Sequence, residues 1–199
     1  MIVITHRKLC RRPFLEQIEL LASAGPEMVI LREKDLSDDD LAQLAERCLD
    51  ICRGHGVPLS VNTNIEVASE LGIGRVHVPI QTARDNDLSG FGTVGISVHS
   101  ASEAAEAQDL GADYLIAGHV FPTACKIGEP RGTGYIRDVC SAVDIPVYGV
   151  GGINPENRHR VLEAGASGVC VMSSAMTTED PAGLVRSLGG HNSSYILRV

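Results

Sequence analysis

The sequence has no tryptophan, only 4% aromatic residues and no long apolar run. A membrane-spanning helix needs about 20 consecutive apolar residues, so we expect no transmembrane segment and no membrane partner. The first residues also lack the basic start and the apolar stretch of a secretory signal peptide. We therefore expect a cytoplasmic protein.

Basic residues are fewer than acidic ones, with 17 Lys and Arg against 25 Asp and Glu, which gives a formal net charge of −8. Phosphate backbones attract basic surfaces, so we expect no nucleic-acid partner. None of the six cysteines forms a Cys-x-x-Cys pair. Cys48 and Cys52 lie one helical turn apart and would need further ligands to hold a metal, so buried thiols in a reducing compartment are the better interpretation.

Short runs rich in Val and Ile alternate with helical periodicity along the whole chain. Such repeated βα units with short connections predict a parallel sheet. Eight units predict a single-domain (β/α)8 TIM barrel over residues 1–199. A doubly wound open sheet is the alternative, but no Gly-x-Gly-x-x-Gly follows the first run. The predicted strands are residues 2–6, 28–33, 59–62, 75–79, 93–99, 114–120, 146–152 and 168–173; only residues 80–92, between two of them, lack a strong helical pattern.

The loops after the seventh and eighth strands of such barrels commonly bind phosphate. Here Gly151 and Gly152 end the seventh run, and Pro155 opens the next predicted helix, whose free N–H groups would face an anion. Ser173 and Ser174 end the eighth run and would add hydroxyl groups. We predict a phosphate site from these residues, with ordinary turn glycines as the alternative.

A lone imidazole, His119, ends the sixth run, beside Thr123 and Lys126. Histidine can give and take a proton near neutral pH, so His119 is the predicted acid/base, and a structural rim histidine is the alternative. The long loop over residues 121–134 also holds Arg131 and suits an anion-gripping lid, or is a plain solvated loop.

Charged and polar residues also end the second and third runs. Arg32 and Lys34 would hold a second anionic group such as a carboxylate, or would form salt bridges with Glu33 or Asp35. Asn62 ends the third run and is a further substrate-binding candidate. His77 and His99 are weaker candidates for lining the pocket. No two histidines have ligand-like spacing with a carboxylate, so we expect no zinc site.

Several motifs together resemble the thiamin phosphate synthase/TenI superfamily. The likeness runs in order from about Ile2 to Met176, and the superfamily fold is a (β/α)8 barrel. The matching segments are Leu31-Arg32-Glu33-Lys34, residues 95–100, residues 111–114, Phe121-Pro122-Thr123-Ala124-Cys125-Lys126, residues 149–153 and residues 168–174.

Two activities share that superfamily. Thiamin phosphate synthases join a pyrimidine diphosphate to a thiazole phosphate and hold Mg²⁺ with carboxylates after the third and fourth strands. Here those places read Asn62-Thr63-Asn64 and His77-Val78-Pro79-Ile80-Gln81-Thr82, without a carboxylate. Mg²⁺ usually needs at least one carboxylate. The segment from Gly118-His119 to Arg131-Gly132 instead resembles the TenI-type thiazole tautomerases, which use this histidine as acid/base.

The resemblance therefore implies an isomerase that aromatises a thiazole carboxylate phosphate by a 1,3-proton shift, with no metal and no cofactor. It also implies a homodimer or a higher homo-oligomer. Retention of both Arg32 and Lys34 points back toward the synthases, so thiamin phosphate synthase is the first alternative. A regulatory ligand-binding barrel and an isomerase of another phosphorylated metabolite stay open, as does the role of Cys125.

Overall fold

The computed structural model describes residues 1–126 and 128–189 of the chain. Its eight parallel strands follow one another in chain order in a closed barrel, and helices alternate with them, so the predicted (β/α)8 fold class is confirmed. The strands are β1 Ile2–Ile4, β2 Met28–Leu31, β3 Leu59–Asn62, β4 Arg75–Pro79, β5 Thr93–Val98, β6 Tyr114–Gly118, β7 Val147–Val150 and β8 Gly168–Val171. The helices are η1 Arg7–Leu9, α1 Phe14–Ser23, α2 Asp38–Gly54, α3 Ile65–Glu70, α4 Ile80–Asp85, α5 Ala101–Asp109, α6 Gly132–Ser141, α7 Arg158–Glu163, α8 Ser173–Thr177 and α9 Pro181–Leu188.

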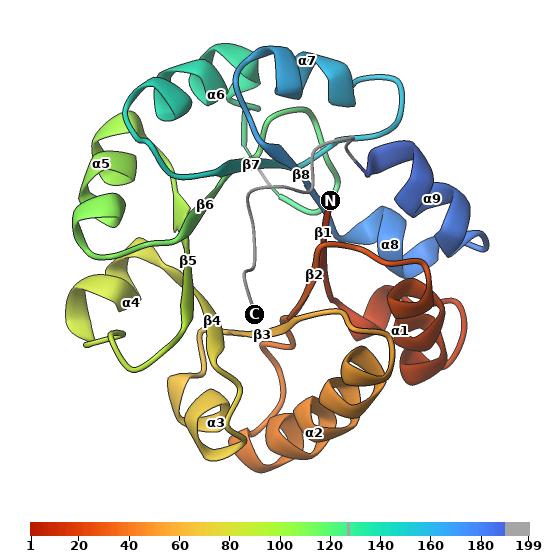
Figure 1. Ribbon diagram of the computed structural model, residues 1–199. Helices are drawn as coiled ribbons and strands as arrows, with labels where there is room; N and C mark the ends of the chain where they lie inside the picture. Colours follow the sequence, from red (N-terminus) through yellow and green to blue (C-terminus); the bar gives the residue numbers. More distant parts are fainter. Residues whose placement is uncertain (127, 190–199) are drawn as a thin grey trace. The chain divides into compact units, whose positions relative to one another are not determined.

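The contacts divide the chain into two compact units, of which the first holds residues 1–73 and continues from residue 171. In it β2 pairs with both β1 and β3, with Ile30 opposite Ile4 and Ser60. All four residues of β2 are buried, as expected for a parallel strand that is covered on both faces. Outside the strands, α1 packs against α2 and α9 (Figure 1).

The second unit holds residues 74–170, with β4 to β7, the start of β8 and helices α4 to α7. Its strands pair in sequence, and β6 is buried along its whole length between β5 and β7. Gly95 allows this close packing, because a Cβ atom there would lie 2.1 Å from the Tyr114 ring. The buried aromatic Tyr114 in turn contacts Tyr148 edge to face, with ring centroids 6.1 Å apart.

Two helices differ from the sequence prediction. Residues 80–92, which lack a strong helical pattern, contain the short helix α4, and its buried Ile80 and Ala83 give too few turns for a periodic signal. The helix predicted to open at Pro155 begins only at Arg158, because the Asn154 side chain first forms a turn. Its Oδ1 accepts from the N–H groups of Glu156 and Asn157, at 3.0 Å each.

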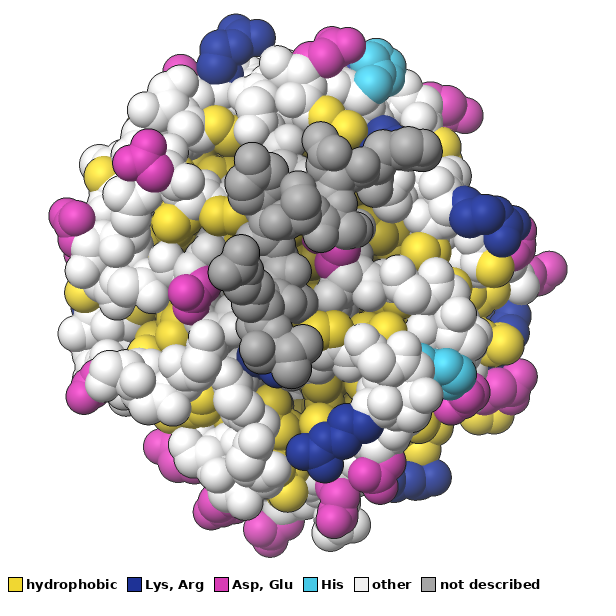
Figure 2. All heavy atoms as spheres, in the orientation of Figure 1, with side chains coloured by type: hydrophobic (Ala, Val, Ile, Leu, Met, Phe, Trp, Pro, Cys, Tyr) yellow, Lys and Arg dark blue, Asp and Glu magenta, His cyan; other side chains and the backbone are white. Residues whose placement is uncertain are grey.

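Charged side chains are dispersed over the face shown in Figure 2, and neither sign gathers there in a large patch. Within residues 1–126 and 128–189, no helix is long and apolar enough to cross a membrane.

Candidate functional site

His119 follows β6 directly and lies against the loop that follows β7. Beyond the end of the strand, the N–H of Val120 donates to the Val150 carbonyl at 2.9 Å, and that of Phe121 donates to the Gly151 carbonyl at 3.0 Å. These bonds continue the β6–β7 pairing past the strands. The imidazole is therefore held at the carboxyl end of β6, where barrel enzymes carry their chemistry, and His119 is only 6% exposed.

Glycines make this close approach possible. A Cβ atom on Gly118 would lie 2.3 Å from the Val150 carbonyl oxygen, and one on Gly151 would lie 2.4 Å from the Cβ of His119. Gly151 and Gly152 also have positive φ angles of 99° and 66°, which other residues rarely adopt. The structure thus brings predicted residues His119, Gly151 and Gly152 together, while their ligands remain predictions.

The imidazole of His119 makes one polar contact among the described residues. Its Nε2 lies 3.2 Å from the carbonyl oxygen of Gly128. A carbonyl oxygen only accepts, so in the neutral ring Nε2 carries the proton. The other nitrogen, Nδ1, is buried and has no hydrogen-bond partner in the described part of the chain. It therefore holds the lone pair that a general base requires.

Arg131, which the sequence places in an anion-gripping loop, bonds to the backbone at two places. Its N–H donates to the His119 carbonyl at 3.0 Å, and its Nη1 donates to the His99 carbonyl at 2.8 Å. The guanidinium also lies 5.2 Å from the centre of the Tyr135 ring. In the same loop, Thr123 Oγ1 accepts from the N–H of Cys125 at 3.2 Å, and Lys126 is exposed.

His77, a weaker candidate for lining the pocket, is buried and only 3% exposed. Its Nε2 is hydrogen-bonded to Ser97 Oγ at 2.7 Å, and its Nδ1 lies 3.2 Å from the Tyr114 hydroxyl. Burial lowers the pKa of His77 to about 3, so the ring stays neutral. Ser97 was not singled out by sequence reasoning. Its only signal is its place two residues after Gly95, on the same face of β5.

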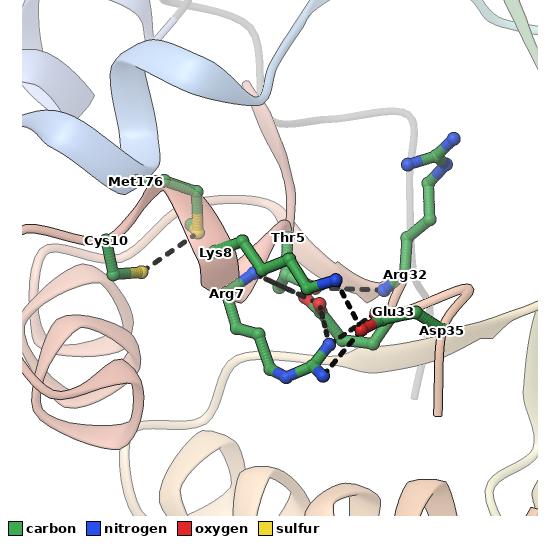
Figure 3. A network of polar contacts seen from close by, with 8 residues as sticks. All are labelled: Thr5, Arg7, Lys8, Cys10, Arg32, Glu33, Asp35 and Met176. Carbon is green, nitrogen blue, oxygen red and sulfur yellow. Dashed lines mark hydrogen bonds and ion pairs between the residues drawn. The ribbon is translucent and has the colours of Figure 1, made fainter. Parts of the chain in front are cut away.

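In the first unit, a network of polar contacts surrounds the buried carboxylate of Glu33 (Figure 3). Glu33 accepts from the Thr5 hydroxyl at 2.7 Å, from the Arg7 N–H and from Arg7 Nη1. Asp35 pairs with Arg7 and Lys8, and hydrogen bonds from both hold its pKa well below the usual range. Both carboxylates are thus paired with Arg7 or Lys8 and not with Arg32 or Lys34.

Arg32 and Lys34 accordingly do not form the salt bridges that were the alternative to ligand binding. The Arg32 N–H donates to Thr5 Oγ1 at 2.9 Å, while its half-buried guanidinium points away from the network around Glu33 in Figure 3. Lys34 is exposed. Their role as anion ligands stays a prediction.

The other predicted residues of the first unit lie at strand ends. Asn62 ends β3, and its Nδ2 donates to Thr63 Oγ1 at 2.7 Å. Ser173 and Ser174 open α8 instead of ending β8, and the Ser174 carbonyl accepts from the N–H of Thr178. Strand β8 ends at Val171, two residues before the predicted end, because the helix starts immediately after Met172.

The residues at the two places expected for magnesium ligands do not fit that ion. Asn64 caps α3 by accepting from the Val67 N–H, and its Nδ2 donates to Asp38. After β4, the Gln81 amide donates to Asp85 on the same helix. Among residues 1–126 and 128–189, no group of three His, Cys, Asp or Glu side chains is placed to hold a metal ion.

Comparison with known proteins decides the family. The family model described as thiamine monophosphate synthase matches residues 1–175. The chain belongs to this family. The superfamily resemblance of the sequence motifs is thereby confirmed.

Similar proteins carry the name of the synthase. A thiamine-phosphate synthase of Moorella thermoacetica is 35% identical over 94% of this chain and 92% of its own length. A bifunctional ThiM/ThiE protein of thiamine biosynthesis from Symbiobacterium thermophilum is 37% identical over 86% of this chain, which spans only 37% of that longer protein. The solved structure of thiamine phosphate pyrophosphorylase from Pyrococcus furiosus matches with a TM-score of 0.81 and 30% identity, over 94% of this chain and 92% of that one. These names favour the synthase over the tautomerase predicted from the sequence.

Proposed function

We propose that the protein is an enzyme of thiamin biosynthesis that binds a phosphorylated thiazole, and that it aromatises a thiazole carboxylate phosphate with His119 as general acid/base. The observation that carries this proposal is the His119 ring. It is buried at the carboxyl end of β6, where Nε2 lies 3.2 Å from the Gly128 carbonyl oxygen and Nδ1 has no hydrogen-bond partner among the described residues. A neutral imidazole of this kind can accept a proton from one carbon and return it to another.

The proposed reaction needs no electron transfer. His119 removes the proton from ring carbon C2, and the C–H electron pair enters the ring as the thiazole becomes aromatic. The imidazolium then returns a proton to the exocyclic carbon, where the electron pair of the exocyclic C=C π bond forms the new C–H bond as that double bond is lost. The substrate and product are isomers, and a positioned base of this kind typically contributes about 10²–10⁴-fold to the rate.

Phosphate binding is proposed for the glycine loop after β7, together with the hydroxyl groups of Ser173 and Ser174. The phosphate was expected to face free N–H groups of a helix opened by Pro155, but the N–H groups of Glu156 and Asn157 are already bonded to Asn154. The backbone of Gly151 and Gly152 is therefore the stronger candidate on this loop. Thr123, Lys126 and Asn62 are further proposed contacts, and Arg32 and Lys34 are the proposed partners of the substrate carboxylate.

Thiamine-phosphate synthase is the second candidate, because the relatives carry that name. It shares the thiazole phosphate site but also needs a pyrimidine diphosphate and carboxylate ligands for Mg²⁺. Asn64 and Gln81, at the two expected places, supply amides that are already hydrogen-bonded. The residues at the expected magnesium site therefore support the tautomerase, whereas the names of the similar proteins support the synthase.

One pair of assays separates the two. The first follows the ultraviolet absorbance of the non-aromatic thiazole carboxylate phosphate in EDTA, with wild type, His119→Asn and His159→Gln. The tautomerase predicts fast conversion that is lost in His119→Asn and kept in His159→Gln, whose side chain is exposed. The second assay measures thiamin phosphate formation from thiazole phosphate and pyrimidine diphosphate with Mg²⁺. Product in this assay, with no acceleration in the first, would replace the tautomerase by the synthase.

A further inference from the structure

The first turn of α6 is fastened to the end of β5 by two side chains. Arg131 Nη1 donates to the His99 carbonyl at 2.8 Å, and the Tyr135 hydroxyl donates to the neighbouring Val98 carbonyl at 2.7 Å. The Arg131 guanidinium lies over the Tyr135 ring, so the two side chains also support each other. We call Arg131 and Tyr135 the α6 clamp.

Arg131 and the next residue, Gly132, also bond to the backbone at His119 and Val120. The N–H of Arg131 donates to the His119 carbonyl, and the N–H of Gly132 donates to the Val120 carbonyl, at 3.0 Å each. Only Glu129 and Pro130 separate Arg131 from Gly128, and proline fixes its own φ angle. The Gly128 carbonyl is therefore separated from the clamp by only two residues of the chain.

The Gly128 carbonyl is the group that selects the protonated nitrogen of His119. It lies 3.2 Å from Nε2 and can only accept, so it favours the form protonated at Nε2 and leaves the lone pair on Nδ1. A net hydrogen bond of this type shifts the ratio of two forms by about fivefold. A loop that drifts from the ring would lose that selection.

We propose that Arg131 and Tyr135 are positioning residues that keep the Gly128 carbonyl on His119 Nε2 and thereby hold the neutral ring in one tautomer. The consequence for catalysis rests on the proposed acid/base role of His119, whereas the tautomer itself does not. Neither side chain is required to touch the substrate.

The test is two-bond ¹H–¹⁵N correlation spectroscopy of protein labelled in its histidine rings, recorded at pH 8 without ligand. His119→Asn assigns the signals. In wild type we expect His119 to be protonated at Nε2. In Arg131→Ala the ratio of the Nε2–H to the Nδ1–H form is expected to fall about fivefold, toward that of a solvated histidine. Arg137→Ala is the matched control, since Arg137 is exposed on the same helix.

Tyr135→Phe tests the proposal even if Arg131→Ala does not fold, because it removes one hydroxyl group and keeps the ring. We expect a smaller change of the tautomer ratio in the same direction. Arg131→Lys keeps the charge and a donor for the His99 carbonyl, so it should restore part of the ratio. With thiazole substrate, Arg131→Ala should lower kcat about tenfold or more, as for other small displacements of a catalytic group, while KM changes little.

Unchanged His119 signals in both Arg131→Ala and Tyr135→Phe would overturn the proposal, as would a wild-type ring protonated at Nδ1. If the tautomer responds as expected but wild type does not aromatise the thiazole, the clamp stands and the proposed function fails.

Discussion

His77, one of the buried histidines of the second unit, offers a quantitative test of the structure. Burial lowers its pKa to about 3, whereas an exposed histidine of the unfolded chain titrates near pH 6.5. Between these two pH values, the unfolded chain binds a proton that the folded chain does not. The free energy of unfolding therefore falls as the pH falls from about 6.5 toward 3, and the contribution of His77 is fully favourable only above that range.

The size of the effect follows from the width of that range. Each pH unit below 6.5 costs about 1.4 kcal/mol per proton, so at pH 5 the loss relative to pH 8 is about 2 kcal/mol from His77 alone. Other groups also contribute to the pH dependence. The informative quantity is therefore the difference between two proteins that differ only at this ring.

Urea unfolding at pH 8 and pH 5 measures it in wild type, His77→Gln and His159→Gln. Glutamine cannot titrate, so His77→Gln should lose about 2 kcal/mol less between the two pH values than wild type. Its stability at pH 8 should be lower, since it disturbs the contacts with Ser97 and Tyr114. His159 is exposed, and its variant should follow wild type. An equal loss in wild type and His77→Gln would refute the buried, neutral ring.

Three further predictions concern separate parts of the molecule. In urea unfolding, Glu33→Gln should lower the free energy of unfolding by about 2–3 kcal/mol, because a buried carboxylate with three donor groups loses its charge. Glu179→Gln, at an exposed ion pair, should change it by less than about 0.5 kcal/mol, and equal effects of the two variants would contradict the network. Gly151→Ala should lower kcat about tenfold or more in the thiazole assay, because the new Cβ would lie 2.4 Å from that of His119. Gly90→Ala places its Cβ in open space and should leave kcat unchanged, and full activity of Gly151→Ala would show that His119 can move freely. A thiol reagent should label exposed Cys125 in the folded protein but reach Cys48 and Cys52 only after urea, because both are buried and burial raises the pKa of Cys52 to about 12. Peptide mapping that finds Cys48 or Cys52 labelled before urea is added would contradict this.

Much of the fold could be predicted from local patterns. Strands Leu59–Asn62 and Arg75–Pro79 have the bounds that apolar runs and punctuating residues indicate. Strands β1, β2, β6, β7 and β8 each end two residues before the predicted end, and the other errors lie at short helices. Residues 80–85 give less than two turns of pattern, and the start of α7 depends on the Asn154 side chain, which competes with the helix for backbone N–H groups.

The candidate site was only partly predictable. His119 and the glycines after β7 stand out because a titratable ring and small residues end neighbouring strands. The burial of His77 and its hydrogen bond to Ser97 depend on β4 and β5 lying side by side, and nothing local in the sequence shows that pairing. The partners of Glu33 and Asp35 were also open, since charge alone does not distinguish Arg7 and Lys8 from Arg32 and Lys34.

By itself, the sequence determined the class of fold, the residue types at each strand end and the absence of carboxylates at Asn62-Thr63-Asn64, because periodicity and chemical identity are local properties of the chain. Only the tertiary structure placed the Gly128 carbonyl beside Nε2 of His119, paired Glu33 and Asp35 with Arg7 and Lys8, and bonded Arg131 to the end of β5. These depend on distances between residues that are far apart along the chain. Such distances exist only once the strands have paired and the helices have packed.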